Sequence, residues 1–381
     1  MRALHVIESL TATGGAERGL VREISSFSKS MEQRVVLLYD RTDLAPQLIG
    51  SGIGVDVVGL SEGLGSRSWP LALRHVRAIA REFDPDVIQS SLFLSNLVAQ
   101  LGARRAGTPV VSNLVLSGDR DLLDAYQPGA ASWRARQLRK LAGWAARGDH
   151  VYFRALTEHV KETNATLLGF DRSRATVIPR SVDLPDADDV LSRSQLGMPD
   201  GRIVVNVGRR FPQKGQLLLV EAFAAVKEQV SEAHLLIIGK DGESSGPINE
   251  AIGRLGIESA VTLIGHSERV SDYLAHSDVF AFSSVMEGLG TAVLEAMASG
   301  LPIVAFDIPP VREATADGRF ADLVEVGNVD ALGRGIVRAL SDGDRNPSAH
   351  DWIAEHHDIE DVSSKVEDLL RVAAGGGERI G

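Results

Sequence analysis

The stretch SDVFAFSSVMEGLGTAVLEAMASGLPIVA, residues 277–305, carries the most informative pattern in the chain. Asp278–Phe282 is a short apolar run followed by two serines, which is typical of a buried parallel strand. Gly288 and Gly290 then break the chain, and Thr291–Ala298 has the composition of a helix. A glycine turn between a strand and a helix directs backbone N–H groups and the positive end of the helix dipole at one point. The pattern predicts an anion site there, above all for phosphate.

Two carboxylates flank this turn. Glu287 precedes it, and Glu295 lies in the N-terminal half of the helix that follows. One carboxylate can accept hydrogen bonds from two neighbouring sugar hydroxyls. On spacing alone, Glu287 could equally be a charge of the first helical turn and Glu295 part of a solvated helix face.

The segment EGLGTAVLEAMASGLPIVA resembles the E-x7-E region of retaining glycosyltransferases of the GT-B fold, family 4, also called glycosyl transferases group 1. The resemblance extends over nearly the whole chain. It implies an α/β protein with two Rossmann-like, doubly wound domains that face a central cleft. It also implies a metal-independent transferase that moves a sugar, with retention, from a nucleotide-diphosphate sugar to an acceptor hydroxyl. That acceptor would be a glycan, a lipid-linked molecule or a small molecule, as in cell-envelope polysaccharide biosynthesis.

Composition and charge are those of a globular enzyme. The 381 residues suffice for two domains, no apolar run reaches eighteen residues, and the absence of cysteine fits a cytoplasmic location. Residues 1–185 hold 23 Lys and Arg against 19 Asp and Glu, a net +4. The remaining residues hold 17 against 32, a net −15. This distribution argues against nucleic-acid binding and allows the first half to approach an anionic surface, at the inner face of the membrane for example.

Apolar runs alternate with helical patterns in both halves, which predicts two parallel sheets covered by helices. We place an acceptor-binding domain at residues 1–185, beside a linker rich in Asp, Pro and Ser. A nucleotide-sugar domain follows at residues 186–350. Residues 351–381 form a helix that, by the resemblance, crosses back to the first domain, followed by a tail expected to be disordered.

The first strand, Leu4–Ile7, leads into the glycine pair Gly14 and Gly15 and then into a helix. Such a turn can approach a phosphate, although tight turns of this kind are common. By the resemblance, this glycine loop would lie under the donor phosphate and the acceptor.

In the second half, strand Ile203–Val207 runs into GRRFPQKG, residues 208–215. Two cations five residues apart at the end of a strand can hold a diphosphate, because arginine offers a fork of donors and lysine a movable charge. Solvated loop cations are the alternative on spacing alone. The segment resembles the diphosphate-binding G-R-x-x-P-x-K-G of the family, which selects Arg209 and Lys214 and leaves out Arg210.

The resemblance also implies that the turn at Gly265 and His266 lies beside the nucleotide base. It assigns catalysis to Arg209, Lys214 and Glu287, and ribose binding to Glu295. The predicted donor site comprises Gly14, Gly15, Arg209, Lys214, Gly265, His266, Glu287, Gly288, Leu289, Gly290, Thr291 and Glu295.

The acceptor side departs from the family pattern. Many relatives carry a histidine after one of two strands, where this chain has QSSLF and SNLVLSGDR. The polar residues available near the acceptor or donor sugar are Asn113, Ser117, Asp119 and Arg120, with an ordinary polar loop as the alternative. We interpret His159 as a residue at the start of a helix; a catalytic base is the alternative.

The segment Ser132–Arg147 combines two tryptophans with five basic residues in a helical pattern. A basic amphipathic helix of this kind can bind an anionic membrane. The alternative is a helix that packs on the sheet and leaves its basic face in water.

No metal or other cofactor is expected, because no Asp-x-Asp type of metal pair is evident near the donor site. Two other functions remain open: a nucleotide-sugar epimerase of the same fold, and a nucleotide-sugar-binding protein without catalysis. A dinucleotide oxidoreductase is disfavoured, since Gly14 and Gly15 lack the G-x-G-x-x-G pattern.

Overall fold

The structure is a computed structural model that describes all residues except 13, 61–68, 127–132, 187–188 and 376–381. The chain forms two compact units, one made of Met1–Ser181 with Ile359–Gly381 and the other of Val182–Asp358. The first boundary therefore lies slightly before the predicted residue 185. The second lies after the predicted residue 350. Most of the tail expected to be disordered, residues 376–381, lies outside the described residues.

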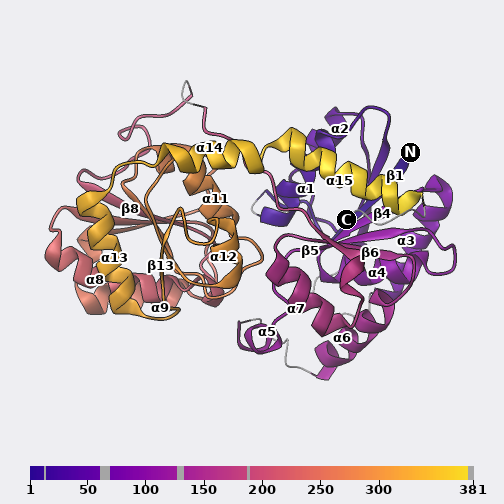
Figure 1. The fold of residues 1–381 in the computed structure, drawn as a ribbon, viewed down its shortest axis with the longest axis horizontal. Coiled ribbons are helices and arrows are strands. Elements are labelled where there is room, and N and C mark those ends of the chain that lie inside the picture. The colour runs from indigo at the N-terminus through magenta and orange to yellow at the C-terminus, as the bar shows by residue number, and fades with distance from the viewer. Residues whose placement is uncertain (13, 61–68, 127–132, 187–188, 376–381) are drawn as a thin grey trace. The chain divides into compact units, whose positions relative to one another are not determined.

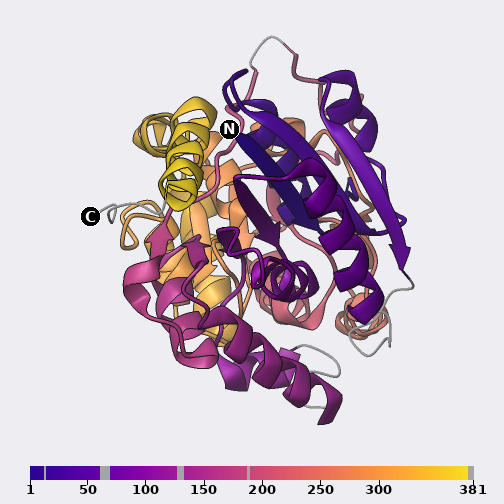
Figure 2. The same ribbon diagram turned by 90° about the vertical axis from the view of Figure 1, so that its right-hand side faces the viewer.

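The first unit contains a parallel seven-stranded sheet in the order β3-β2-β1-β4-β5-β6-β7 (Figure 1). Helices lie on both faces of this sheet (Figure 2). The strands are β1 Arg2–Ile7, β2 Glu32–Tyr39, β3 Gly54–Leu60, β4 Val87–Ser91, β5 Val110–Leu114, β6 Val151–Ala155 and β7 Ala175–Val177. The helices are α1 Gly15–Ser25, α2 Ala45–Gly50, α3 Trp69–Phe83, α4 Phe93–Ala103, α5 Arg120–Tyr126, α6 Trp133–Ala146, α7 Glu158–Leu168 and α15 Ile359–Ala374, with a 3-10 turn at Arg172–Arg174.

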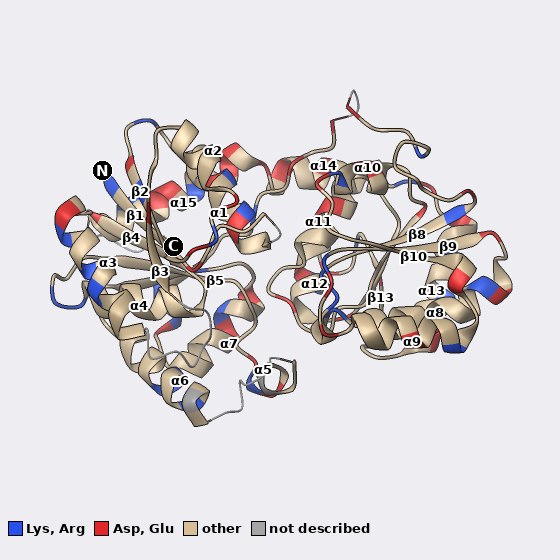
Figure 3. Cartoon of the chain, turned by 180° about the vertical axis from the view of Figure 1, so that it is seen from behind, with Lys and Arg blue, Asp and Glu red and all other residues tan. Residues whose placement is uncertain are grey.

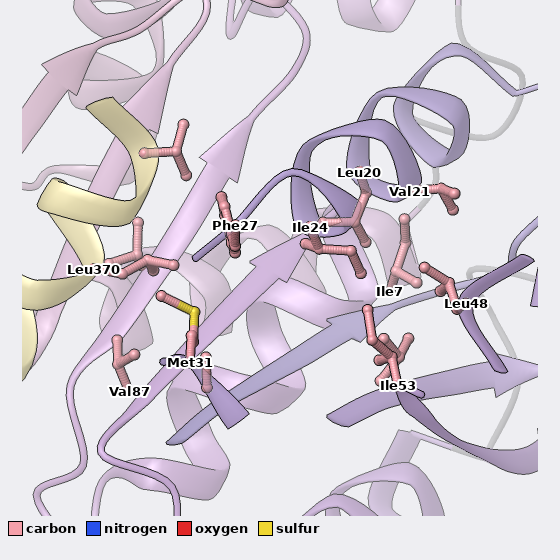
Figure 4. Packing of buried hydrophobic residues seen from close by; sticks show 14 of the residues in the cluster. Ile7, Leu20, Val21, Ile24, Phe27, Met31, Leu48, Ile53, Val87 and Leu370 are labelled. Carbon is pink, nitrogen blue, oxygen red and sulfur yellow. The ribbon is translucent and has the colours of Figure 1, made fainter. Parts of the chain in front are cut away.

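The central strands β4 and β5 are fully buried, as apolar runs in a doubly wound sheet should be, whereas the edge strand β3 is largely exposed or half-buried. Alternate residues of β1 face opposite sides: Ile7 belongs to one core cluster, and Leu4 and Val6 belong to another. Helix α15 completes the first cluster with Val366 and Leu370. Figure 4 shows Leu370 extending from α15 toward the core. The last helix thus packs on the first unit although the second unit lies between them in sequence.

The second unit contains a parallel six-stranded sheet in the order β10-β9-β8-β11-β12-β13. Its strands are β8 Arg202–Val207, β9 Ala233–Ile238, β10 Val261–Ile264, β11 Val279–Phe282, β12 Ile303–Phe306 and β13 Asp322–Val324. Its helices are α8 Gln216–Gln229, α9 Ser245–Leu255, α10 Val270–Ala275, α11 Thr291–Ala298, α12 Pro309–Ala314, α13 Val329–Asp342 and α14 Pro347–His356, with 3-10 turns at Pro212–Lys214 and Glu258–Ala260. Lys and Arg are interspersed with Asp and Glu over the helices and loops of both units (Figure 3).

The two doubly wound parallel sheets confirm the predicted fold class. Sequence reasoning missed five helices, namely α2, α5, α9, α12 and α14. Within residues 267–276 the helix spans only Val270–Ala275. In that segment the hydroxyl of Ser267 accepts a hydrogen bond from the N–H of Arg269, a local turn that delays the start of the helix.

Candidate functional site in the second unit

The carboxyl ends of β8 and β11 meet at the point where the strand order of the second sheet reverses. Strand β8 pairs with β9 on one side and with β11 on the other. In open α/β sheets, connections leave in opposite directions at such a switch point and leave a crevice for ligands. The loops after β8 and β11 carry the predicted residues Arg209, Lys214 and Glu287.

An ion pair joins these two loops. The Nζ atom of Lys214 donates a hydrogen bond to Oε1 of Glu287 at 2.6 Å. The two side chains are 22% and 11% exposed. Two further hydrogen bonds join the same loops. The N–H of Val285 donates to the carbonyl oxygen of Gln213 at 2.9 Å, and the hydroxyl of Ser283 donates to the carbonyl oxygen of Lys214 at 2.9 Å. A cation and a carboxylate are therefore held together at the switch point.

Gly215 makes this close approach feasible. Its φ angle is +59°, and a Cβ atom there would lie only 2.0 Å from the carbonyl oxygen of Ser283. No other residue type has both the left-handed backbone and the space. The glycine that ends GRRFPQKG thus allows Lys214 to reach Glu287.

Arg209 and Arg210 are adjacent in sequence but have different roles. Arg210 is buried, and its guanidinium hydrogen bonds to Asp241 at 2.8 Å and to the carbonyl of Ile264 at 3.2 Å. The hydrogen bond from Arg210 is the main cause that lowers the pKa of the Asp241 carboxyl. Arg209 is exposed, with its guanidinium 5.1 Å from the centre of the Phe211 ring. Arg210 therefore ties the loops after β8, β9 and β10 together, and Arg209 is available to a ligand.

Helix α11 begins directly after Gly290, whose φ angle is +81°. Within the described residues, no side chain caps its N-terminus. N–H groups of a first helical turn lack acceptors within the helix, so they and the helix dipole favour an anion. Leu289 is buried, which fixes the turn, and Thr291 is half-buried at the helix start. The predicted anion site thus has the expected backbone geometry.

The remaining donor residues of this unit lie around the same end of the sheet. Glu295 is half-buried in α11, and Gly288 lies in the turn between Glu287 and the helix. Gly265 and His266 directly follow β10 and are both exposed. The structure brings Lys214 and Glu287 into direct contact and leaves Gly265 and His266 on a neighbouring loop.

Candidate residues in the first unit

The glycine loop of the first unit surrounds a carboxylate. The hydroxyls of Ser9 and Thr11 each donate to Oε1 of Glu17 at 3.2 Å. The Glu17 carboxylate lies so close to Gly14 that a Cβ atom there would be 1.9 Å from Oε2. Sequence reasoning selected Gly14 and Gly15 and missed Glu17. The available signal was the glutamate within the first turn of the helix, which follows two hydroxyl residues.

Arg180 was also missed as a neighbour of this loop. Its guanidinium nitrogen lies 3.4 Å from where a Cβ of Gly15 would be. Burial is the main cause that lowers its pKa, to about 10, and the nearby Arg154 acts in the same direction. The available signal was an arginine directly after the apolar run at residues 175–179.

The four predicted acceptor residues divide into two pairs. Asn113 and Ser117 line a cavity at the end of β5. Asp119 caps α5, because its Oδ1 accepts hydrogen bonds from the N–H groups of Asp121 at 3.0 Å and Leu122 at 3.2 Å. Arg120 is the first residue of that helix. His159 lies in the first turn of α7, and its Nε2 is 3.1 Å from the Ser117 hydroxyl.

Helix α6 packs against α4 through much of its apolar side. Ala142 and Ala145 are buried in a cluster with Leu97 and Leu101. Trp144 is 47% exposed, and the guanidinium of Arg104 lies 3.8 Å from its ring centre. Trp133 is 66% exposed at the start of the helix. The buried alanines thus support the packed-helix alternative for the middle of α6, and both tryptophans of the helix remain exposed.

Across the parts of the chain that the structure describes, no group of three His, Asp or Glu side chains is placed to bind a metal ion. No helix in those parts is both long and apolar enough to cross a lipid bilayer.

Two family models match the chain. The model of glycosyl transferases group 1 matches residues 190–358, and that of the glycosyl transferase 4-like domain matches residues 14–181. A glycosyltransferase of Methanocaldococcus jannaschii is 38% identical over 108 residues, which are 28% of this chain and 26% of that protein. The chain thus matches only about a quarter of that relative's length.

Longer similarities exist at lower identity. The D-inositol 3-phosphate glycosyltransferase of Nocardia farcinica is 27% identical over 359 residues, which cover 88% of this chain and 76% of that protein. Among solved structures, HepE of Anabaena in complex with UDP and glucose has a TM-score of 0.81 at 22% identity. That alignment covers 97% of this chain and 99% of HepE. The shared fold is that of the GT-B glycosyltransferases.

Proposed function

The chain belongs to the group 1 glycosyltransferases of the GT-B fold, and we propose that it moves a sugar from a nucleotide-diphosphate sugar to an acceptor hydroxyl. The observation that carries the proposal is the Lys214–Glu287 pair at the switch point of the second sheet, beside the N-terminus of α11. A cation, a carboxylate and free helix N–H groups suit a sugar attached to a diphosphate.

The donor diphosphate would bind Arg209, Lys214 and the N–H groups of Leu289–Thr291. These groups would stabilise the negative charge that grows on the departing diphosphate. The proposal assigns this role to the two side-chain cations and not to a metal ion. The complex of HepE with UDP and glucose supports a nucleotide-sugar donor for this fold.

The carboxylates would position the rest of the donor. Glu295 would hold ribose hydroxyls, Glu287 would orient the sugar, and the turn at Gly265 and His266 would contact the base. When the diphosphate draws Lys214 away, the Glu287 carboxylate becomes available to sugar hydroxyls. In the first unit, Gly14 and Gly15 would border the donor phosphate and acceptor, and Asn113 and Ser117 would contact the acceptor.

In the reaction, the bond between the anomeric carbon and the diphosphate oxygen breaks, and the acceptor oxygen forms a new bond to that carbon. The acceptor hydroxyl proton passes to the departing diphosphate. Attack on the face that the diphosphate leaves gives retention of configuration. The support for retention is the family resemblance, whose E-x7-E segment contains Glu287 and Glu295.

Peripheral binding to an anionic membrane through residues 132–147 is part of the proposal for acceptors that carry lipids. The exposed Trp133 and the basic residues of α6 support it. Sedimentation with vesicles of anionic lipid at low salt tests it. Wild-type protein that sediments with the vesicles, and Trp133→Ala protein that does not, would support membrane binding. Wild-type protein that stays in the supernatant would contradict it.

Turnover measurements test the transferase proposal. The protein is incubated with UDP-, GDP-, ADP- and dTDP-sugars, with and without alcohol and glycan acceptors, and nucleoside diphosphate release and product configuration are followed by NMR. The proposal predicts a glycoside with the donor's anomeric configuration. Isomerised donor without an acceptor would establish an epimerase instead, and binding without turnover would establish a non-catalytic protein.

A further inference from the structure

A cavity of about 350 Å³ lies in the first unit, beyond the end of β5 and between helices α4, α6 and α7. Its walls are mostly apolar, with Phe93, Leu97, Leu138 and Leu167 among the residues that line it. An engineered protein cavity of about 150 Å³ binds benzene, so this cavity can hold an apolar group of roughly a dozen non-hydrogen atoms. Its volume is also within the range of small-molecule sites, about 300–1,000 Å³.

Two asparagines give the cavity a polar end. Asn96 donates from Nδ2 to the carbonyl of Asn113 at 3.1 Å, which fixes the orientation of the Asn96 amide. Asn113 donates from Nδ2 to the hydroxyl of Ser91 at 2.8 Å and is only 5% exposed. The Oδ1 atoms of both are buried and accept no hydrogen bond among the described residues. Buried acceptors normally have a donor, and both residues line the cavity.

The same end of the cavity carries a carboxylate. Oε1 of Glu8 accepts a hydrogen bond from the N–H of Leu94 at 2.9 Å, at the start of α4. Burial raises the pKa of Glu8, against the effect of this hydrogen bond. Leu92, beside it, has a φ angle of +76°, a strained backbone that is concentrated at functional sites. The oxygen atoms of Glu8, Asn96 and Asn113 can accept hydrogen bonds from a ligand hydroxyl at this end of the cavity.

We propose that this cavity binds the apolar part of the sugar acceptor, which is therefore an amphiphile. An apolar segment of about a dozen non-hydrogen atoms fills the cavity, and neutral hydroxyl groups donate to the asparagine oxygens. The proposal rests on the proposed transferase function and specifies the chemistry of its second substrate. It also gives Asn113 a role: its amide oxygen recognises an acceptor hydroxyl.

Methyl and octyl β-D-glucoside, which differ only in their apolar chain, test the cavity by calorimetry. Wild-type protein is expected to bind the octyl glucoside at least tenfold more tightly than the methyl glucoside. Ala135→Phe fills the cavity from α6 and should abolish this difference, as should Leu167→Trp from α7. Thr166→Trp, at the exposed neighbour of Leu167 on α7, should preserve the difference. Equal affinities in the wild type, or an unchanged preference in both filled variants, overturns the proposal.

A second readout separates this proposal from the transferase function. In wild-type protein with a nucleotide-sugar donor, the octyl glucoside should raise nucleoside diphosphate release at least tenfold over the methyl glucoside. Binding of the octyl glucoside without this increase overturns the acceptor assignment. Nucleoside diphosphate binding to the second unit should be the same in Ala135→Phe and wild type. If wild-type protein bound no nucleoside diphosphate, the transferase proposal would be refuted. The ratio of the octyl and methyl glucoside affinities would still test whether the cavity binds an apolar chain.

Discussion

The Glu287 carboxylate accepts a hydrogen bond from the Lys214 ammonium at 2.6 Å, with both groups largely shielded from water. In the proposed mechanism, the Lys214 ammonium breaks its hydrogen bond with Glu287 and binds the donor diphosphate instead. Glu287 therefore competes with the diphosphate before it orients the sugar. The pair couples donor binding to the release of a carboxylate at the same point of the sheet.

Glu287→Gln should separate these two effects. Nucleoside diphosphate should bind severalfold more tightly, because a neutral amide competes less for Lys214. Turnover should fall by about a hundredfold, because the sugar loses a charged partner. Calorimetry and steady-state rates measure the two quantities, with the exposed Glu250→Gln as control. Weaker diphosphate binding would show that Glu287 positions Lys214 and does not compete with the ligand.

A second set of charged and polar side chains stabilises the first unit. Nδ1 of the fully buried His5 lies 2.7 Å from Oε1 of Gln89, whose Nε2 donates to Glu23 at 3.0 Å. Glu23 also forms a buried ion pair with Arg154. Burial lowers the pKa of His5 to about 4, so this imidazole is neutral in the folded protein at neutral pH.

His5 should make the stability of the first unit depend on pH. Between about pH 6.5 and pH 4 the unfolded chain binds a proton at His5 that the folded chain does not, so stability falls as pH falls. The loss should be on the order of 2 kcal/mol between about pH 7.5 and pH 5. Urea unfolding at the two pH values measures it. His5→Gln should reduce this loss and the exposed His75→Gln should not; an equal loss in all three proteins would contradict the assignment.

At the scale of elements, the loops after β8 and β11 depend on one glycine. Gly215→Ala would place a Cβ atom against the carbonyl of Ser283 and force an alanine to a φ angle of +59°. The second unit should lose about 3 kcal/mol of stability or more. Gly253→Ala, exposed in the last turn of α9, should instead gain up to about 1 kcal/mol. Urea unfolding compares the two variants, and equal stabilities would refute the close-approach argument.

Most strands could be predicted because strands buried on both faces are continuous apolar runs. Helices α2 and α12, with six residues each, are too short to show a helical period. The start of α14 did carry a signal, since Asn346 caps the helix and Pro347 begins it. Short helices and helix starts thus accounted for most of the missed structure.

Within the site, local patterns selected the right chemical groups but not their contacts. Lys214 and Glu287 are 73 residues apart, and only the strand order that places β8 beside β11 brings them together. The opposite orientations of Arg209 and Arg210 depend on Asp241 and Ile264 from other loops. No sequence pattern marks the cavity near Asn113, because its walls come from helices α4, α5, α6 and α7 and from strands β5 and β6.

At the scale of the whole molecule, the chain leaves the first unit after Ser181 and returns to it at Ile359. Helix α15 buries Val366 and Leu370 in the first core, and Glu367 accepts hydrogen bonds from the N–H of Ser28 at 2.8 Å and its hydroxyl at 2.6 Å. The first unit is thus completed by a segment made after the second unit.

Leu370→Ala should therefore destabilise the first unit by about 2–5 kcal/mol, because it leaves a cavity where α15 packs against α1, β4 and β5. Ser364→Ala, exposed on the same helix, should change stability by less than about 0.5 kcal/mol. Urea unfolding followed by tryptophan fluorescence measures both. A neutral Leu370→Ala would mean that α15 is dispensable to the first core.

The central claim is that the second unit binds a nucleoside diphosphate at the switch point between β8 and β11. Calorimetric titration of UDP, GDP, ADP and dTDP into wild type, Lys214→Ala and the exposed Lys29→Ala tests it most directly. The account predicts that at least one nucleotide binds wild type and Lys29→Ala alike, and at least tenfold more weakly to Lys214→Ala. Equal binding to all three proteins, or no binding of any nucleotide to wild type, would contradict it.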